Sequence, residues 1–190
     1  MTHQRVPIWG VALVALGMGA TQSAQAAPIT IGVAGGDVGG YVSRIGDFRP
    51  TRDASLAAAK RVFGEPSSRK LTSNNSCDVQ WTSPKLHMTF SNFGLPPAGQ
   101  TVCGDRGGFA QTFKARGRRF RTWKGLRVGQ REWRINDLHP SAEYRRGSWW
   151  LKTSISVYGP GDQEFAVADA TVDRYDRVYA IRGWIGAAGD

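Results

Sequence analysis

The sequence predicts an α+β protein made of two helix-plus-antiparallel-sheet units in tandem, with the helices packed on one face of the sheet. Each half of the chain contains one stretch in which apolar residues recur at helical spacing, followed by runs in which apolar and polar residues alternate. Turn residues separate these runs, whereas a parallel sheet would need helices between its strands. We therefore expect one unit over residues 44–117 and a second over residues 118–190.

The first 26 residues have the three parts of a secretory signal peptide. Arg5 precedes an apolar run over residues 6–20, and Ala24-Gln25-Ala26 supplies a small-x-small cleavage pattern. The run is shorter than the roughly 20 apolar residues of a transmembrane helix. No cysteine lies near the cleavage site to carry a lipid. We expect cleavage after Ala26 and a secreted or periplasmic bacterial protein with no membrane span.

The first unit begins after a glycine-rich stretch. Residues 27–43 contain one short strand pattern at 29–33 and then many glycines, which predicts a flexible N-terminal segment. Residues 53–63 predict a helix, capped by Asp53 and ended by Gly64. Alternation at residues 77–81 and 86–90 then predicts two strands.

The second unit repeats this order of elements. Residues 129–138 predict a short helix, in which Ile135 and Leu138 lie one turn apart and Pro140 prevents continuation. Strand patterns follow at residues 149–158, 165–172 and 177–184, with turn residues at 159–162 and 173–176.

Cys77 and Cys103 are the two cysteines of the chain. An exported protein meets an oxidising environment, in which such a pair forms a disulfide. Closing a loop of this length stabilises the fold by about 3–4 kcal/mol in the chain-entropy model. A reactive thiol or a metal pair is the alternative, although Cys-x-x-Cys spacing is missing. We expect a structural disulfide.

Part of the second half resembles known exported proteins. Residues 123–129 (Trp-Lys-Gly-Leu-Arg-Val-Gly), 138–140, 172–178 and 184–186 carry the resemblance. They are similar to the helix–strand modules of β-lactamase-inhibitor-like proteins and of outer-membrane assembly lipoproteins with the small SmpA/OmlA domain. The resemblance implies a module that binds another protein on its sheet face and is not an enzyme. Gln130-Arg131 departs from the family's helix-capping Asp-Ser, and the lipid-bearing cysteine is missing.

Candidate catalytic groups are sparse. After removal of the signal peptide, the histidines are His87, on the polar side of a strand pattern, and His139, at a predicted helix end. Nucleophilic catalysis needs a base placed beside a nucleophile, and no nucleophile-elbow or metal-ligand motif occurs in the sequence. We therefore expect a protein that is not an enzyme and holds no cofactor or metal. A cell-envelope hydrolase is the least favoured alternative.

Positive charge is concentrated in the middle of the chain. Residues 106–152 hold 13 of the 25 lysines and arginines, but only three of the 15 acids. The centre of this stretch, residues 114–124, contains Arg116, Arg118, Arg119 and Arg121 beside two aromatic residues. Guanidinium groups interleaved with aromatics can pair with phosphates and stack on bases. The segment predicts binding to an anionic envelope polymer or extracellular nucleic acid, against the simpler interpretation of a solvated basic loop.

The strand at residues 149–158 suggests another binding surface. If Leu151 faces the helix, then Trp150, Lys152 and Tyr158 face the opposite way. Packing needs only one face, so aromatic residues on the other face favour a partner, unless residues 27–43 or the first half of the chain cover them. Our main hypothesis is an exported binding protein that recognises another exported or envelope protein through this aromatic and basic sheet face. Polyanion binding through residues 114–124 is the alternative.

Overall fold

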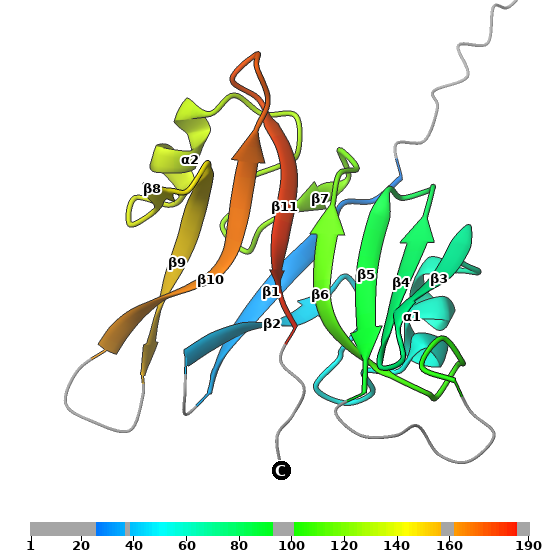
Figure 1. Cartoon of the computed structure of the whole chain (residues 1–190). Helices are drawn as coiled ribbons and strands as arrows, with labels where there is room; N and C mark the ends of the chain where they lie inside the picture. The colour runs from blue at the N-terminus through cyan, green and yellow to red at the C-terminus, as the bar shows by residue number, and fades with distance from the viewer. Residues whose placement is uncertain (1–25, 37–38, 93–100, 157–161, 186–190) are drawn as a thin grey trace, which may run out of the picture.

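The fold is mostly β. The computed structural model describes residues 26–36, 39–92, 101–156 and 162–185, and it contains 50% strand and 10% helix (Figure 1). The predicted α+β fold of two helix-plus-sheet units is therefore wrong. The two helices, α1 (Leu56–Phe63) and α2 (Trp133–Leu138), are short, and strands from both halves of the chain join in one large sheet.

The large sheet has eight antiparallel strands in the order β3-β4-β5-β6-β11-β10-β9-β8. Its two halves meet where β6 pairs with β11, so no boundary between units divides the hydrogen-bonded sheet. The strands are β3 (Ser68–Ser73), β4 (Ser76–Trp81), β5 (Leu86–Ser91), β6 (Phe109–Ala115), β8 (Glu143–Arg145), β9 (Ser148–Ser156), β10 (Asp162–Val172) and β11 (Val178–Trp184).

A second sheet of three strands covers the middle of the large one. It consists of β1 (Ile29–Gly36), β2 (Gly39–Ile45) and β7 (Phe120–Arg121), in the order β2-β1-β7. Most of the glycine-rich stretch predicted to be flexible is therefore strand. The strand expected at residues 29–33 lies within β1, whereas β2 gives no strand signal because glycine is depleted in strands. Ile31, Val42 and Ile45 are fully buried, and β2 contacts β9, β10 and β11.

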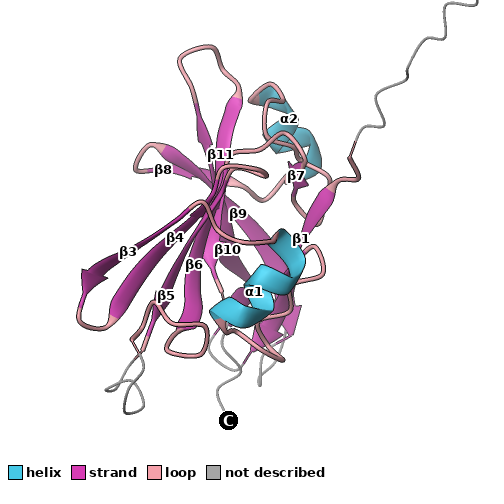
Figure 2. Cartoon of the chain, turned by 90° about the vertical axis from the view of Figure 1, so that its right-hand side faces the viewer, coloured by secondary structure: helices cyan, strands magenta, loops and turns pink. Residues whose placement is uncertain are grey.

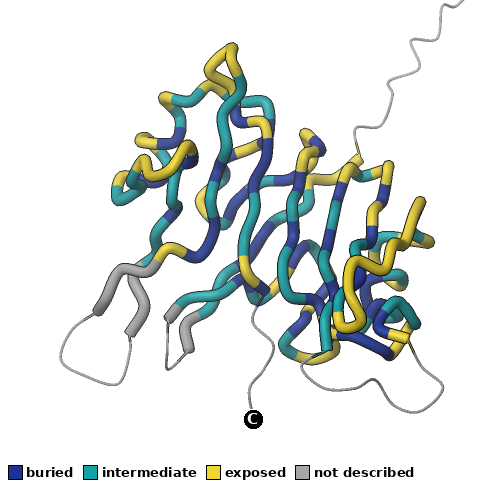
Figure 3. The backbone as a smooth tube through the Cα atoms, in the orientation of Figure 1, coloured by how far each residue is buried: buried dark blue, intermediate teal, exposed yellow. Residues whose placement is uncertain are grey.

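The core lies on one face of the large sheet. Both helices and β1 lie on the same side of that sheet (Figure 2). On β5, Leu86, Met88 and Phe90 are buried while His87 and Thr89 are not, and this alternation recurs along the central strands (Figure 3). The opposite face, which we call the open face, carries no helix among the described residues.

The helix boundaries differ from the predicted ones for local reasons. The N-cap of α1 is Ser55, whose Oγ accepts a hydrogen bond from the Ala58 amide at 3.2 Å, while Asp53 accepts one from the Ser55 amide. Helix α2 begins only at Trp133, because the preceding residues bond to another segment: the Gly129 amide donates to the Val178 carbonyl at 2.7 Å.

The predicted disulfide between Cys77 and Cys103 is confirmed. It links buried Cys77 of β4 to the segment before β6, with 5.2 Å between the Cα atoms. Within the described part of the chain, neither helix is long and apolar enough to cross a membrane. The predicted signal peptide lies almost entirely in residues 1–25, outside the described residues, and stays a prediction.

Candidate functional site

A cleft of about 910 Å³ opens where the large sheet splits. Strands β6 and β11 pair over four residue pairs, from Thr112 opposite Trp184 to Ala115 opposite Ile181. Beyond Ala115 the two strands separate. The Arg116 amide bonds to the Lys85 carbonyl at 2.9 Å, on the β5 side, while the Val178 amide of β11 bonds to the Gln130 carbonyl at 2.8 Å. The β6 side therefore stays beside β5, whereas β11 turns to the segment around Gln130, and the cleft lies between them.

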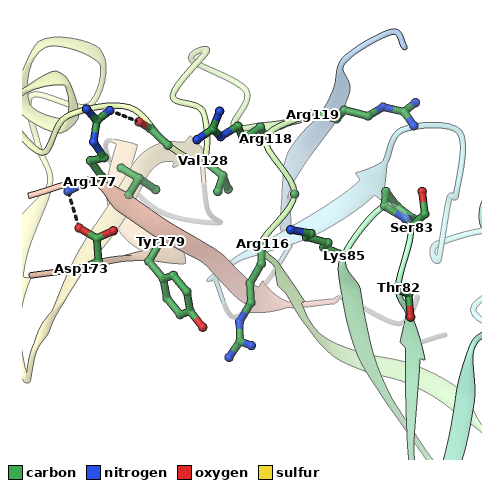
Figure 4. A pocket seen from close by; sticks show the side chains of 14 residues that line it. Thr82, Ser83, Lys85, Arg116, Arg118, Arg119, Val128, Asp173, Arg177 and Tyr179 are labelled. Carbon is green, nitrogen blue, oxygen red and sulfur yellow. Dashed lines mark hydrogen bonds between the residues drawn. The ribbon is translucent and has the colours of Figure 1, made fainter. Parts of the chain in front are cut away.

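Five cationic side chains from three segments line this cleft. Lys85 comes from the β4–β5 turn, Arg116, Arg118 and Arg119 from the connection between β6 and β7, and Arg177 from the β10–β11 turn. Figure 4 shows them around the cleft together with Tyr179. We call this set the basic cleft.

No cation of the basic cleft forms an ion pair with a carboxylate among the described residues. Their contacts are with neutral groups. The Arg116 guanidinium lies over the Tyr179 ring, with Cζ 4.9 Å from the ring centroid. Arg177 and Arg119 each donate to a backbone carbonyl at 3.1 Å, that of Gly129 and that of Ala27 respectively. All five residues are exposed, so their charges remain available to a ligand.

Among the described residues, Asp173 is the one acidic residue that lines the cleft, and it is engaged in the local turn. Its Oδ1 accepts hydrogen bonds from the Tyr175 amide at 2.8 Å and from the Arg177 amide at 3.1 Å. These bonds hold the β10–β11 turn in shape and direct the carboxylate toward backbone donors (Figure 4). The cleft therefore presents an excess of positive charge.

One wall depends on a close backbone approach. A Cβ atom on Gly117 would lie 2.0 Å from the Pro84 carbonyl oxygen, so only glycine allows this segment to lie against the β4–β5 turn. This contact brings Lys85 beside the arginines. Sequence spacing gives no sign of it, because residues 84 and 117 are far apart along the chain.

The structure brings together three of the four arginines that the sequence singled out. Arg116, Arg118 and Arg119 line the cleft, whereas the Arg121 Nε donates to Thr30 Oγ1 at 2.8 Å and lies outside it. Sequence reasoning missed Lys85, Arg177 and Tyr179. Turn residues on both sides of residue 175 mark that region as a loop, but nothing in the sequence places it beside the arginine-rich segment.

The predicted aromatic sheet face is only partly described. Trp150 and Lys152 lie on the face opposite buried Leu151, and Tyr158 lies outside the described residues. Trp150 is half-buried, with the Arg145 guanidinium 5.4 Å from its ring centroid. The Lys152 side chain is 17% exposed and forms an ion pair with Glu143, so its charge is neutralised.

The two described histidines have different surroundings. His87 lies on the open face, with Nε2 3.5 Å from Asp78 Oδ1. His139 is fully buried, and its Nε2 forms a hydrogen bond with Thr122 Oγ1 at 2.8 Å. Burial, reinforced by the nearby charge of Lys124, lowers the pKa of His139 to about 4. Among the described residues, no group of three or more His, Cys, Asp or Glu side chains is arranged to hold a metal ion.

No family model, curated protein or solved structure matches this chain. The resemblance of its second half to β-lactamase-inhibitor-like and SmpA/OmlA-like modules therefore stays a prediction.

Proposed function

We propose that this chain is an exported, non-enzymatic binding protein that holds an anionic polymer in the basic cleft. One observation carries the proposal: five cations from three segments converge on one cleft, and none pairs with a carboxylate among the described residues. A cleft lined by charges of one sign concentrates ions of the opposite sign, so this uncompensated cluster favours an anionic ligand. The disulfide and the predicted signal peptide support an oxidising compartment outside the cytoplasm.

The chemistry of the cleft favours phosphate, sulfate or carboxylate groups. Four of its cations are arginines, whose planar guanidinium matches such anions with two parallel hydrogen bonds. A volume of about 910 Å³ is at the upper end of ordinary ligand pockets and accommodates several charged units of a polymer. Extracellular nucleic acid and acidic envelope polysaccharides both carry such units.

Retention on heparin-agarose tests the proposal. The double charge reversal R116E/R118E removes two guanidiniums from the cleft and should release the protein at much lower salt than the wild type. The slope of log affinity against log salt concentration should become shallower by about two, because about two fewer counterions are released on binding. The matched control is R52E/K70E, which changes the net charge equally at exposed positions that do not line the cleft. Equal loss of retention in both variants would show that net charge alone governs binding and would end the proposal.

Protein binding through the open face is a second candidate. It is favoured by Trp184, which is 69% exposed on β11. This candidate predicts that one exported protein is captured by the wild type and lost with W184A, while R116E/R118E still captures it.

A further inference from the structure

We infer that the polymer is a single-stranded nucleic acid, whose phosphates follow the cations from the basic cleft onto the open face and whose bases stack on aromatic side chains there. The inference rests on the proposed function, because it extends the binding path that begins in the cleft. It is carried by the register of the large sheet and by two pockets that adjoin the cleft.

The register aligns one row of side chains across the open face. His87 of β5 is paired with Lys114 of β6, Lys114 with Arg182 of β11, Arg182 with Asp169 of β10, and Asp169 with Trp150 of β9. Neighbouring residues such as Ala115, Ile181 and Leu151 are fully buried, so the row points away from the core. Side chains directly opposite one another lie within about 5.5 Å at Cβ, which makes the row continuous.

The row connects with the basic cleft. A neighbouring pocket of about 490 Å³ shares Thr82, Lys85 and Arg116 with the cleft and extends to His87 and Lys114 on the open face. Burial, together with the nearby charges of Arg116 and Arg182, lowers the pKa of Lys114, as expected where like charges crowd together. A backbone of regularly spaced anions would relieve that crowding.

Aromatic side chains alternate with these cations. Tyr179 is 45% exposed beside the cleft, and Trp184 is 69% exposed two residues beyond Arg182 on the same face of β11. Trp184 and Trp150 line a pocket of about 390 Å³ with Arg146, Arg182 and the exposed Ala166 of β10. The backbones of β9 and β11 flank β10 and lie about 9–10 Å apart. The small side chain of Ala166 between them leaves room for a planar ring.

Arg182 is held in position for this role. Its Nε donates to Asp169 Oδ1 at 2.8 Å, and its Nη2 lies 2.6 Å from the same oxygen. The carboxylate offsets part of the positive charge, so this end of the path suits a base better than a phosphate. At the cleft end the carboxylate of Asp173 accepts from backbone amides and forms no ion pair with the described cations there, so that end suits phosphates.

Interleaved cations and aromatic rings distinguish single strands from other polyanions. Stacking on aromatic side chains accepts any base and requires bases that are not paired in a duplex. An acidic polysaccharide offers charge but no planar aromatic base that could stack on Trp184. The open face therefore favours single-stranded nucleic acid.

Fluorescence anisotropy at low salt tests the inference with two labelled probes of equal charge. One is an oligothymidylate of about twelve nucleotides, and the other is an abasic deoxyribose-phosphate oligomer of the same length. The wild type should bind oligothymidylate about tenfold more tightly than the abasic probe. W184A should weaken oligothymidylate binding about tenfold and leave abasic binding unchanged, whereas W184F should retain most of the affinity because phenylalanine still stacks.

W133A is the matched control, because Trp133 is 61% exposed but belongs to α2, away from the open face. It should bind both probes as the wild type does. Circular dichroism melting of each variant separates loss of binding from loss of fold. If W184A is unfolded, the affinity of W184F and the ratio of the wild type's affinities for the two probes still test the inference.

Three other results would overturn the inference in distinguishable ways. Equal affinity for the two probes, with R116E/R118E weakening both, would leave a general polyanion binder and reject base stacking. In a second result, heparin fragments would displace oligothymidylate, bind the wild type more tightly than it does, and bind W184A equally well. That result would indicate an acidic polysaccharide as the ligand. Unchanged binding of both probes by R116E/R118E would reject the proposed function itself.

Discussion

The guanidinium of Arg116 and the ring of Tyr179 face each other across the split between β6 and β11, with Cζ 4.9 Å from the ring centroid. This contact forms just beyond the last residue pair that joins the two strands, Ala115 and Ile181. It joins the two sides of the basic cleft and leaves the positive charge of Arg116 unneutralised. Arg116 thereby serves both the fold and the proposed binding of anions.

The Arg116–Tyr179 contact should be measurable in a double-mutant cycle. Cation–π pairs at exposed sites contribute about 0.5–1 kcal/mol. The unfolding free energies of R116A, Y179L and the double variant, from urea titrations, should give a coupling energy in this range. A coupling within about 0.3 kcal/mol of zero would show that the two side chains are neighbours without energetic consequence.

Burial of His139 should make the fold less stable in mild acid. Its pKa is lowered to about 4 in the folded protein, against an ordinary value of 6.5, so unfolding takes up a proton between these pH values. The stabilisation that neutral His139 contributes is complete above pH 6.5 and is lost as the pH falls toward 4. The unfolding free energy should fall by about 3 kcal/mol in total over this range.

The contribution of His139 is isolated by comparing urea unfolding of the wild type and H139Q across this pH range. The carboxyl groups of Asp53, Asp105 and Glu143 have lowered pKa values and titrate in both proteins. The difference in unfolding free energy between the wild type and H139Q should therefore shrink as the pH falls from 6.5 to 4. Parallel curves over that range would contradict the prediction.

Removal of the disulfide should lower the unfolding free energy by about 3–4 kcal/mol, because the unfolded chain regains the entropy of an open loop. The variant C77A/C103A suits the test, since Cys77 is fully buried and alanine leaves little cavity. Its stability should be the same with and without a reducing agent, whereas the wild type should lose stability on reduction. A wild type insensitive to reduction would contradict a stabilising role.

Gly117 should be required for the shape of the basic cleft. In G117A the new Cβ would lie 2.0 Å from the Pro84 carbonyl oxygen, so the β4–β5 turn must shift, at a cost of roughly 1–3 kcal/mol. Because the shift separates Lys85 from the arginines, retention on heparin should fall as well.

Gly125 provides the comparison for Gly117. A Cβ there meets nothing within 4 Å, but φ is +90°, so G125A should lose about 1 kcal/mol through backbone strain alone. Heparin retention of G125A should equal that of the wild type. If both glycine variants lose heparin retention in proportion to their loss of stability, the local shape of the cleft wall does not determine binding.

Strand positions were predictable where burial alternates along the chain. The alternation of Leu86, Met88 and Phe90 with polar residues predicted β5, and Leu151 predicted the buried side of β9. The Cys77–Cys103 bridge followed from the cysteine count and the predicted compartment alone. The strand positions depend on residues that are close together in the chain, and their periodicity can be read from the residue order.

The glycine-rich strands β1 and β2 show where local reasoning fails. Residues 29–33 were expected to form a strand and lie within β1. Glycine has no side chain to pack and little strand propensity, so the rest of the segment indicated a flexible chain. Three buried anchors, Ile31, Val42 and Ile45, hold the hairpin against the core. Their stabilisation comes from partners far along the chain, which outweigh the local preference.

The residue order alone specified the excess of positive charge, the arginine-rich segment and the strands β4, β5, β9, β10 and β11. Tertiary structure decided that β6 would pair with β11 for only four residue pairs and then diverge. That divergence opens the basic cleft between Lys85 and Arg116 on one side and Arg177 and Tyr179 on the other. Strand pairing is set by burial and hydrogen bonding between distant segments, and these long-range contacts leave no periodic signal in a single sequence.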